Sequence, residues 1–142
     1  MEFEPSERIR ELLDDIDDFV EAELKPVEEE NRAYFDHRRE HVRTDWTDGT
    51  PAAEWVSIVG ELRRRADEAG FYRLQLPEEL GGHDADNLSL AMAWEHLARR
   101  GPGLHNTVDN ALWDQVVGEF RKELLLFEYG SDEQRDRYLS GA

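Results

Sequence analysis

The sequence predicts an all-α protein, folded as an up-and-down bundle of about five to six helices. Apolar residues recur at intervals of three and four over most of the chain, and helix-capping residues stand at the ends of these stretches. Strand and helix patterns do not alternate, which argues against a parallel sheet. A chain of 142 residues fits one domain, so we take 1–142 as a single unit.

The first helix is expected to begin after Ser6, with apolar residues on one face and aspartates on the other. Pro26 should kink or break it, because proline lacks the N–H that an interior helical residue donates. A strongly charged helix is then expected over 27–39. The stretch 44–50, which contains Asp48 followed by Gly49, predicts a loop.

A second helix is expected to begin with Thr50 as N-cap and Pro51 at its first position, and to end at Gly70. The stretch 71–76 predicts a short extended piece. A loop over 77–82 should follow, in which the proline and the glycine pair let the backbone approach a ligand.

The rest of the chain predicts helices over 87–100 and from about 104 to 129, separated by a Gly-Pro-Gly sequence and stopped at Gly130. Ser131 and Gln134 then form an S-x-x-Q capping box for a last helix.

The charge of the chain excludes several classes of partner. Asp and Glu number 34 against 17 Lys and Arg, which gives a net charge of −17 and argues against binding to nucleic acid or an anionic membrane. The absence of Cys excludes disulfides, thiolate nucleophiles and Cys-ligated metals. The sequence has neither a membrane-length apolar run nor a basic secretory leader, so we expect a cytoplasmic protein.

Among the basic residues, Lys25 and Lys122 are the only lysines. An acidic, lysine-poor surface is expected of a protein kept in solution at high salt, where charge repulsion is screened. We therefore hypothesise a halophilic, haloarchaeal-type source.

Two charged motifs are candidates for functional sites. His37, Glu40 and His41 match the H-x-x-E-H zinc pattern, but neighbouring arginines oppose a dication and no third ligand is evident, so we expect a solvated surface and no metal site. The Arg63-Arg64-Arg65 run is too short to offset the negative charge, and pairing with Glu61 and Asp67 along the helix is the favoured interpretation. Spacing alone gives no complete active site.

Several motifs occur in the order typical of one family. They are the helix ending at 62–71, the Leu-Pro-Glu-Glu-Leu-Gly-Gly loop at 76–82, the Trp-Glu-His-Leu-Ala stretch at 94–98, Gly-x-x-x-Gln-x-x-x-Tyr-Leu at 130–139, and Lys-Pro-Val at 25–27. Together they resemble the N-terminal helical domain of the acyl-CoA dehydrogenase family, over nearly the whole chain.

The resemblance implies a reaction. Family members remove two hydrogens across the Cα–Cβ bond of an acyl-CoA thioester, with a Glu as base and FAD as hydride acceptor, and pass electrons to an electron-transfer flavoprotein. The flavin and the catalytic Glu are expected in a central β domain and a C-terminal helical bundle. This chain stops at Ala142, before those segments, so we expect no catalytic residue in it and no FAD bound by it alone.

The resemblance also implies a wall of the acyl pocket, which the family's third-helix pattern places at Leu104, His105, Val108 and Asp109. Apolar Leu104 and Val108 suit an aliphatic chain, while His105 and Asp109 would limit its depth. Ordinary helix packing is the competing interpretation of these residues.

Two functions stay open on this basis. The chain is either the helical part of an acyl-CoA dehydrogenase, truncated or completed by a second polypeptide, or a stand-alone helical interaction module without catalytic activity. An exposed apolar patch, left where other domains dock, would favour the first function. A uniformly polar, acidic surface would favour the second.

Overall fold

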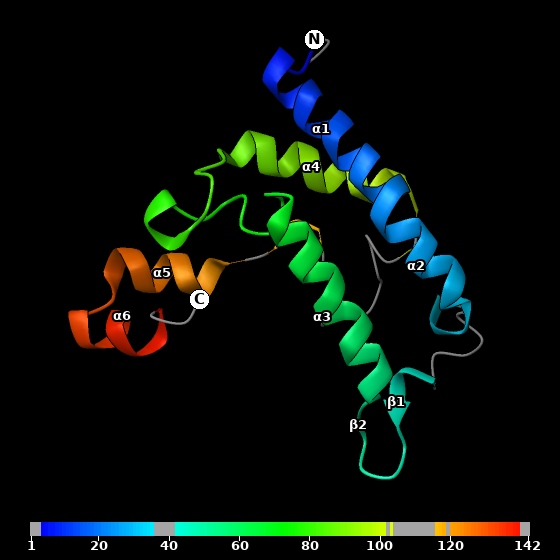
Figure 1. Ribbon diagram of the computed structural model, residues 1–142. Helices are drawn as coiled ribbons and strands as arrows, with labels where there is room; N and C mark the ends of the chain where they lie inside the picture. Colours follow the sequence, from blue (N-terminus) through cyan, green and yellow to red (C-terminus); the bar gives the residue numbers. More distant parts are fainter. Residues whose placement is uncertain (1–3, 36–41, 102, 104–115, 119, 140–142) are drawn as a thin grey trace.

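The computed structural model describes residues 4–35, 42–101, 103, 116–118 and 120–139. Over these ranges the chain is mostly helical, with a single two-stranded antiparallel sheet (Figure 1). The all-α prediction is therefore confirmed. The elements are α1 Glu7–Phe19, a π-helix Val20–Leu24, α2 Lys25–Glu30, a 3₁₀ turn Arg32–Phe35, β1 Thr44–Asp45, β2 Thr50–Pro51, α3 Ala53–Glu68, a 3₁₀ turn Glu78–Leu80, α4 Asn87–Arg99, α5 Arg121–Tyr129 and α6 Asp132–Tyr138.

Helix α1, the π-helix and α2 follow one another without a gap and form one rod, Glu7–Glu30, which we call the first rod (Figure 1). It begins as predicted and passes through Pro26 without a break. The Ser6 hydroxyl accepts a hydrogen bond from the Ile9 N–H at 3.3 Å. The helix continues through Pro26 (Figure 1). A turn of π-helix precedes the proline and places it in the first turn of α2, where a residue does not need to donate an N–H.

The charged helix that follows is shorter than predicted. It ends at Glu30 instead of continuing to 39, and the Asn31 side chain donates to the Val27 carbonyl at 2.8 Å. This local bond caps the last turn, as asparagine commonly does at helix ends. A 3₁₀ turn continues to Phe35, and residues 36–39 lie outside the described part of the chain.

The stretch predicted as a loop is the turn of a small hairpin, in which Thr44 pairs with Pro51 and Asp45 with Thr50. Thr50 is therefore not a helix cap. Its N–H and hydroxyl both donate to Asp48, at 2.9 and 2.7 Å. Helix α3 begins instead at Ala53, because the hairpin holds the preceding residues in extended conformation.

Gly70 ends α3 as predicted, in a left-handed conformation with φ of 85°. The Gly70 N–H donates to the Asp67 carbonyl at 3.0 Å and the Phe71 N–H to the Ala66 carbonyl at 2.8 Å. This pair of bonds is the Schellman motif, which satisfies carbonyls left open at the end of a helix.

The segment 71–76 is not extended, contrary to the prediction. It consists of consecutive turns, with the Leu74 N–H bonded to the Phe71 carbonyl at 3.3 Å and the Leu76 N–H to the Arg73 carbonyl at 3.1 Å. The turns bury the three consecutive residues Leu74, Gln75 and Leu76, whereas an extended segment would point neighbouring side chains to opposite faces.

The long helix expected over 104–129 is also not continuous. The chain is bent at 116–118, and α5 begins only at Arg121, while residues 104–115 lie outside the described ranges. Both predicted ends further on are confirmed: α5 stops at Gly130, and Ser131 and Gln134 form the reciprocal capping box of α6.

The core lies where the first rod, α3 and α4 meet the turns after α3 and the bend at 116–117. Phe19 and Phe71 contact edge to face with ring centroids 5.3 Å apart, and Leu62 is 1% exposed. The buried residues of this core are Ile16, Phe19, Val20, Leu24, Trp55, Val59, Leu62, Ala66, Phe71, Leu74, Leu90, Ala93, Leu97, Val116 and Val117.

In the described part of the chain, no helix combines the length and the apolar character needed to cross a bilayer.

Candidate functional site

The four residues predicted to line an acyl pocket, Leu104, His105, Val108 and Asp109, lie outside the described residues, as do His37, Glu40 and His41. The structure does describe the chain on both sides of residues 104–115, which we call the candidate segment. The described residues on either side therefore show how the two flanks of this segment are attached to the core.

The flank at the end of α4 is fixed to α1 by charge. Arg100 caps α4 and pairs with both Asp17 and Glu21, and only 18% of its side chain is exposed. The His96 Nε2 lies 2.9 Å from the Asp17 Oδ2. Partial burial raises the pKa of Asp17, but the neighbouring His96 and Arg100 lower it by more, so its pKa lies below the usual value.

The flank at 116–118 is fixed by burial and by backbone hydrogen bonds. Val116 and Val117 are each 1% exposed. The Trp94 indole N–H donates to the Val117 carbonyl at 3.4 Å, and the Gly118 N–H donates to the Tyr72 carbonyl at 2.8 Å. Both partners are far from 116–118 in the sequence, so this attachment joins the candidate segment to α4 and to the turns after α3.

Gly118 is needed for that attachment. A Cβ at this position would lie 2.5 Å from the Phe120 ring and 2.7 Å from the Tyr72 carbonyl oxygen. Sequence reasoning placed Gly118 inside a helix and missed this role. The available signal was the glycine itself, which is unfavourable in a helix interior and indicates a bend or a close approach of backbones.

The glycine pair of the 77–82 loop does not offer its backbone to a ligand, contrary to the prediction. The Gly81 N–H donates to the Glu78 carbonyl at 2.9 Å, and the Gly82 N–H to the Pro77 carbonyl at 3.0 Å. A Cβ on Gly82 would lie 2.0 Å from the Leu76 carbonyl oxygen. These glycines let the loop fold onto itself, so the loop is not an open nest for a phosphate.

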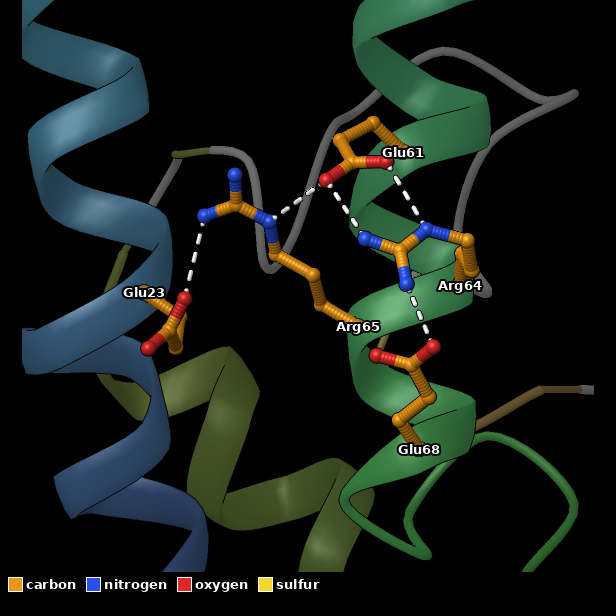
Figure 2. Close-up of polar contacts among 5 residues, drawn as sticks. All are labelled: Glu23, Glu61, Arg64, Arg65 and Glu68. Atoms are coloured by element: carbon orange, nitrogen blue, oxygen red, sulfur yellow. Dashed lines mark hydrogen bonds and ion pairs between the residues drawn. The ribbon is translucent and has the colours of Figure 1, made fainter.

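The arginine run near the end of α3 forms a chain of ion pairs with the first rod (Figure 2). Glu61 accepts from Arg64 and from Arg65, and Arg65 continues to Glu23 on the π-helix at 3.0 Å. Hydrogen bonds from the two arginines lower the pKa of Glu61 to about 2. The predicted pairing along the helix is thus confirmed for Arg64 and Arg65.

The remaining members of the run behave differently from the prediction. Asp67 pairs with Arg73 through two bonds of 2.7 Å and not with its helical neighbours. Arg63 has no carboxylate partner among the described residues. The described residues also contain no group of three or more side chains placed to bind a metal ion.

Comparisons with known proteins identify the class. Residues 6–142 match the model of the family described as "Acyl-CoA dehydrogenase, N-terminal domain". The chain therefore belongs to the acyl-CoA dehydrogenase family, through the N-terminal helical domain.

The chain is 29% identical over 108 residues to acyl-CoA dehydrogenase FadE12 of Mycobacterium tuberculosis strain ATCC 25618 / H37Rv, a match covering 76% of this chain and 22% of that protein. The same values hold for fadE12 of Mycobacterium bovis. The chain thus spans about a fifth of the length of these relatives. No solved structure matches it significantly. The relatives do not support the haloarchaeal source expected from the acidic composition, which stays a prediction.

Proposed function

We propose that this chain is the helical N-terminal part of an FAD-dependent acyl-CoA dehydrogenase, which removes hydrogen across the α,β bond of acyl-CoA thioesters. In this role it contributes a wall of the acyl pocket and an interface with the other domains, and the chemistry is carried out elsewhere. The observation that carries the proposal is the family match over residues 6–142.

The exposed surface of α5 and α6 supports an incomplete enzyme over a stand-alone module. Neither helix has a buried residue within its bounds. Leu125 is 62% exposed, Tyr129 73% and Tyr138 58%. Leu125 and Tyr129 are four residues apart and so share one face of α5. Large apolar side chains on the same helical face are typical of surfaces that meet a partner.

The pocket wall is assigned to Leu104, His105, Val108 and Asp109. The attachments of both flanking regions support this assignment, since a substrate wall needs a fixed support. Arg100 holds one flank to the first rod, and Gly118 holds the other to the turns after α3.

FAD would accept the hydride in the complete enzyme, but the glycine-rich loop at 77–82 does not fit its phosphates. The glycine-rich loop that would be the natural cradle for its phosphates has the N–H groups of both glycines bonded within the loop. We therefore assign no flavin-binding residue in this part of the chain. Acyl-CoA, the remaining domains and an electron-transfer flavoprotein are the partners that the proposal implies.

The experiment expresses the chain with the coding sequence that flanks it and measures acyl-CoA-dependent reduction of an acceptor dye over a series of acyl-chain lengths. Leu104→Trp and Val108→Trp are expected to shift the preference toward shorter chains, because a larger side chain shortens the pocket. Leu88→Trp is the matched control, since Leu88 is 46% exposed on α4.

Two results would overturn the proposal. One is a flanked protein that reduces no dye with any acyl-CoA, which would favour the interaction module. The other is a preparation of the 142-residue chain alone that binds flavin and is active, which would place the chemistry in this chain.

A further inference from the structure

An open cavity of about 440 Å³ lies beside the C-terminal half of α3. Its size falls in the range of small-molecule sites. The cavity lies between the last turns of α3, the turns that follow it and the residue just before α5. Its lining residues are Arg63, Arg64, Asp67, Tyr72, Arg73 and Phe120.

Two of the three arginines in this cavity are already neutralised. Both Arg73 contacts with Asp67 are 2.7 Å long. Arg64 pairs with Glu61 at 2.8 Å and also with Glu68 (Figure 2). Because these carboxylates offset their charges, neither arginine is a strong anion site by itself.

Arg63 is different. Its Nε is buried and has no hydrogen-bond partner, and no carboxylate among the described residues pairs with it. The Nε atoms of Arg100 and Arg135 are in the same state, but those two side chains pair with carboxylates through their other nitrogens. Within the described part of the chain, whose net charge over the full sequence is −17, Arg63 is therefore the cavity arginine without a paired carboxylate.

Another part of the lining is aromatic. The rings of Tyr72 and Phe120 contact edge to face, with centroids 5.3 Å apart and an interplanar angle of 81°. Such a pair offers apolar surface to a flat group placed against it. The cavity thus combines the Arg63 guanidinium, which has no carboxylate partner among the described residues, with the aromatic surface of Tyr72 and Phe120.

We propose that this cavity binds a small organic oxyanion, a carboxylate or phosphate carried on a planar apolar group. Arg63 pairs with the oxyanion through its planar guanidinium, and Tyr72 and Phe120 contact the apolar group. The net negative charge of the chain disfavours extended polyanions, which restricts the ligand to a single small anion. This inference does not depend on the acyl-CoA assignment.

The test titrates the 142-residue protein with phenyl phosphate, benzoate, inorganic phosphate and neutral benzyl alcohol, and follows amide and arginine Nε–H resonances by NMR. Phenyl phosphate or benzoate is expected to shift the Arg63 Nε–H and the amides of Arg73 and Phe120 saturably. Inorganic phosphate and benzyl alcohol should each bind at least tenfold more weakly, because each lacks one half of the recognition. The difference between phenyl phosphate and benzoate shows which oxyanion the site prefers.

Arg63→Gln is expected to weaken binding at least tenfold, and Phe120→Ala at least threefold. Arg99→Gln is the control, since Arg99 is 74% exposed on α4 and pairs with Glu95. The proposal fails if neither aromatic anion gives a saturable shift, if benzyl alcohol binds as well as benzoate, or if Arg63→Gln binds like wild type. The Arg63 Nε–H shift in the wild-type protein keeps the test decisive if a variant does not fold.

Discussion

Replacing Gly82 by alanine should destabilise the fold strongly, although the change adds only one methyl group. The new Cβ would lie 2.0 Å from the Leu76 carbonyl oxygen, 2.4 Å from its carbonyl carbon and 2.5 Å from its Cβ. Two of these atoms belong to the backbone, so no side-chain rotation relieves the overlap. The 77–82 loop must move away from the core instead.

The cost follows from what that movement breaks. Two hydrogen bonds join residues next to the overlap and would be strained or broken. The Gly82 N–H donates to the Pro77 carbonyl at 3.0 Å, and the Asp84 N–H donates to the Leu76 carbonyl at 2.9 Å. Each is worth about 1 kcal/mol, and overpacking of a buried site adds about 1–3 kcal/mol. We therefore expect Gly82→Ala to lower the free energy of unfolding by about 3–5 kcal/mol, against a total of about 5–15 kcal/mol for a domain.

Two other glycines provide matched controls in the same urea-unfolding assay. Gly60 lies within α3 with open space around its Cβ position, so Gly60→Ala should stabilise by about 0.5–1 kcal/mol. Gly49 also has open space but a φ of 77°, so Gly49→Ala isolates the conformational cost of about 1–2 kcal/mol. A Gly82→Ala protein within 0.5 kcal/mol of wild type would refute the steric reasoning.

Three further outcomes are expected. Leu62→Ala should lower the free energy of unfolding by about 2–5 kcal/mol, since Leu62 is 1% exposed in the core, and a loss below 1 kcal/mol would mean that the site is not close-packed. Glu61→Gln should destabilise at neutral pH. The folded pKa of about 2 lies below the ordinary 4.5, so the stabilisation from Glu61 is present above pH 4.5 and lost as the pH falls toward 2; unfolding curves of the two proteins should converge on acidification. Finally, if the charge of −17 reflects adaptation to high salt, the melting temperature should rise steadily with KCl, and a flat profile would contradict that origin.

The order of motifs along the sequence was enough to predict the family, and local patterns predicted most helix ends. Ser6, Asp86 and Ser131 cap their helices through bonds that reach only three residues along the chain. Gly70 adopts the left-handed conformation that ends a helix for an equally local reason. Such interactions depend on neighbours in the sequence, so they can be inferred before any tertiary contact is known.

Tertiary contacts decided the remaining features. Apolar periodicity predicted one helix across 104–129, but buried Val117 and the bond from Gly118 to Tyr72 hold a bend at 116–118. The fixed flanks of the candidate segment depend on Arg100 reaching the first rod, and the cavity depends on Arg63 and Phe120 lining the same space. These contacts join residues far apart in the sequence. A pattern within one segment carries no information about which distant segment will cover it, so the sequence determined the helices and their family, and only packing determined where they bend and what they enclose.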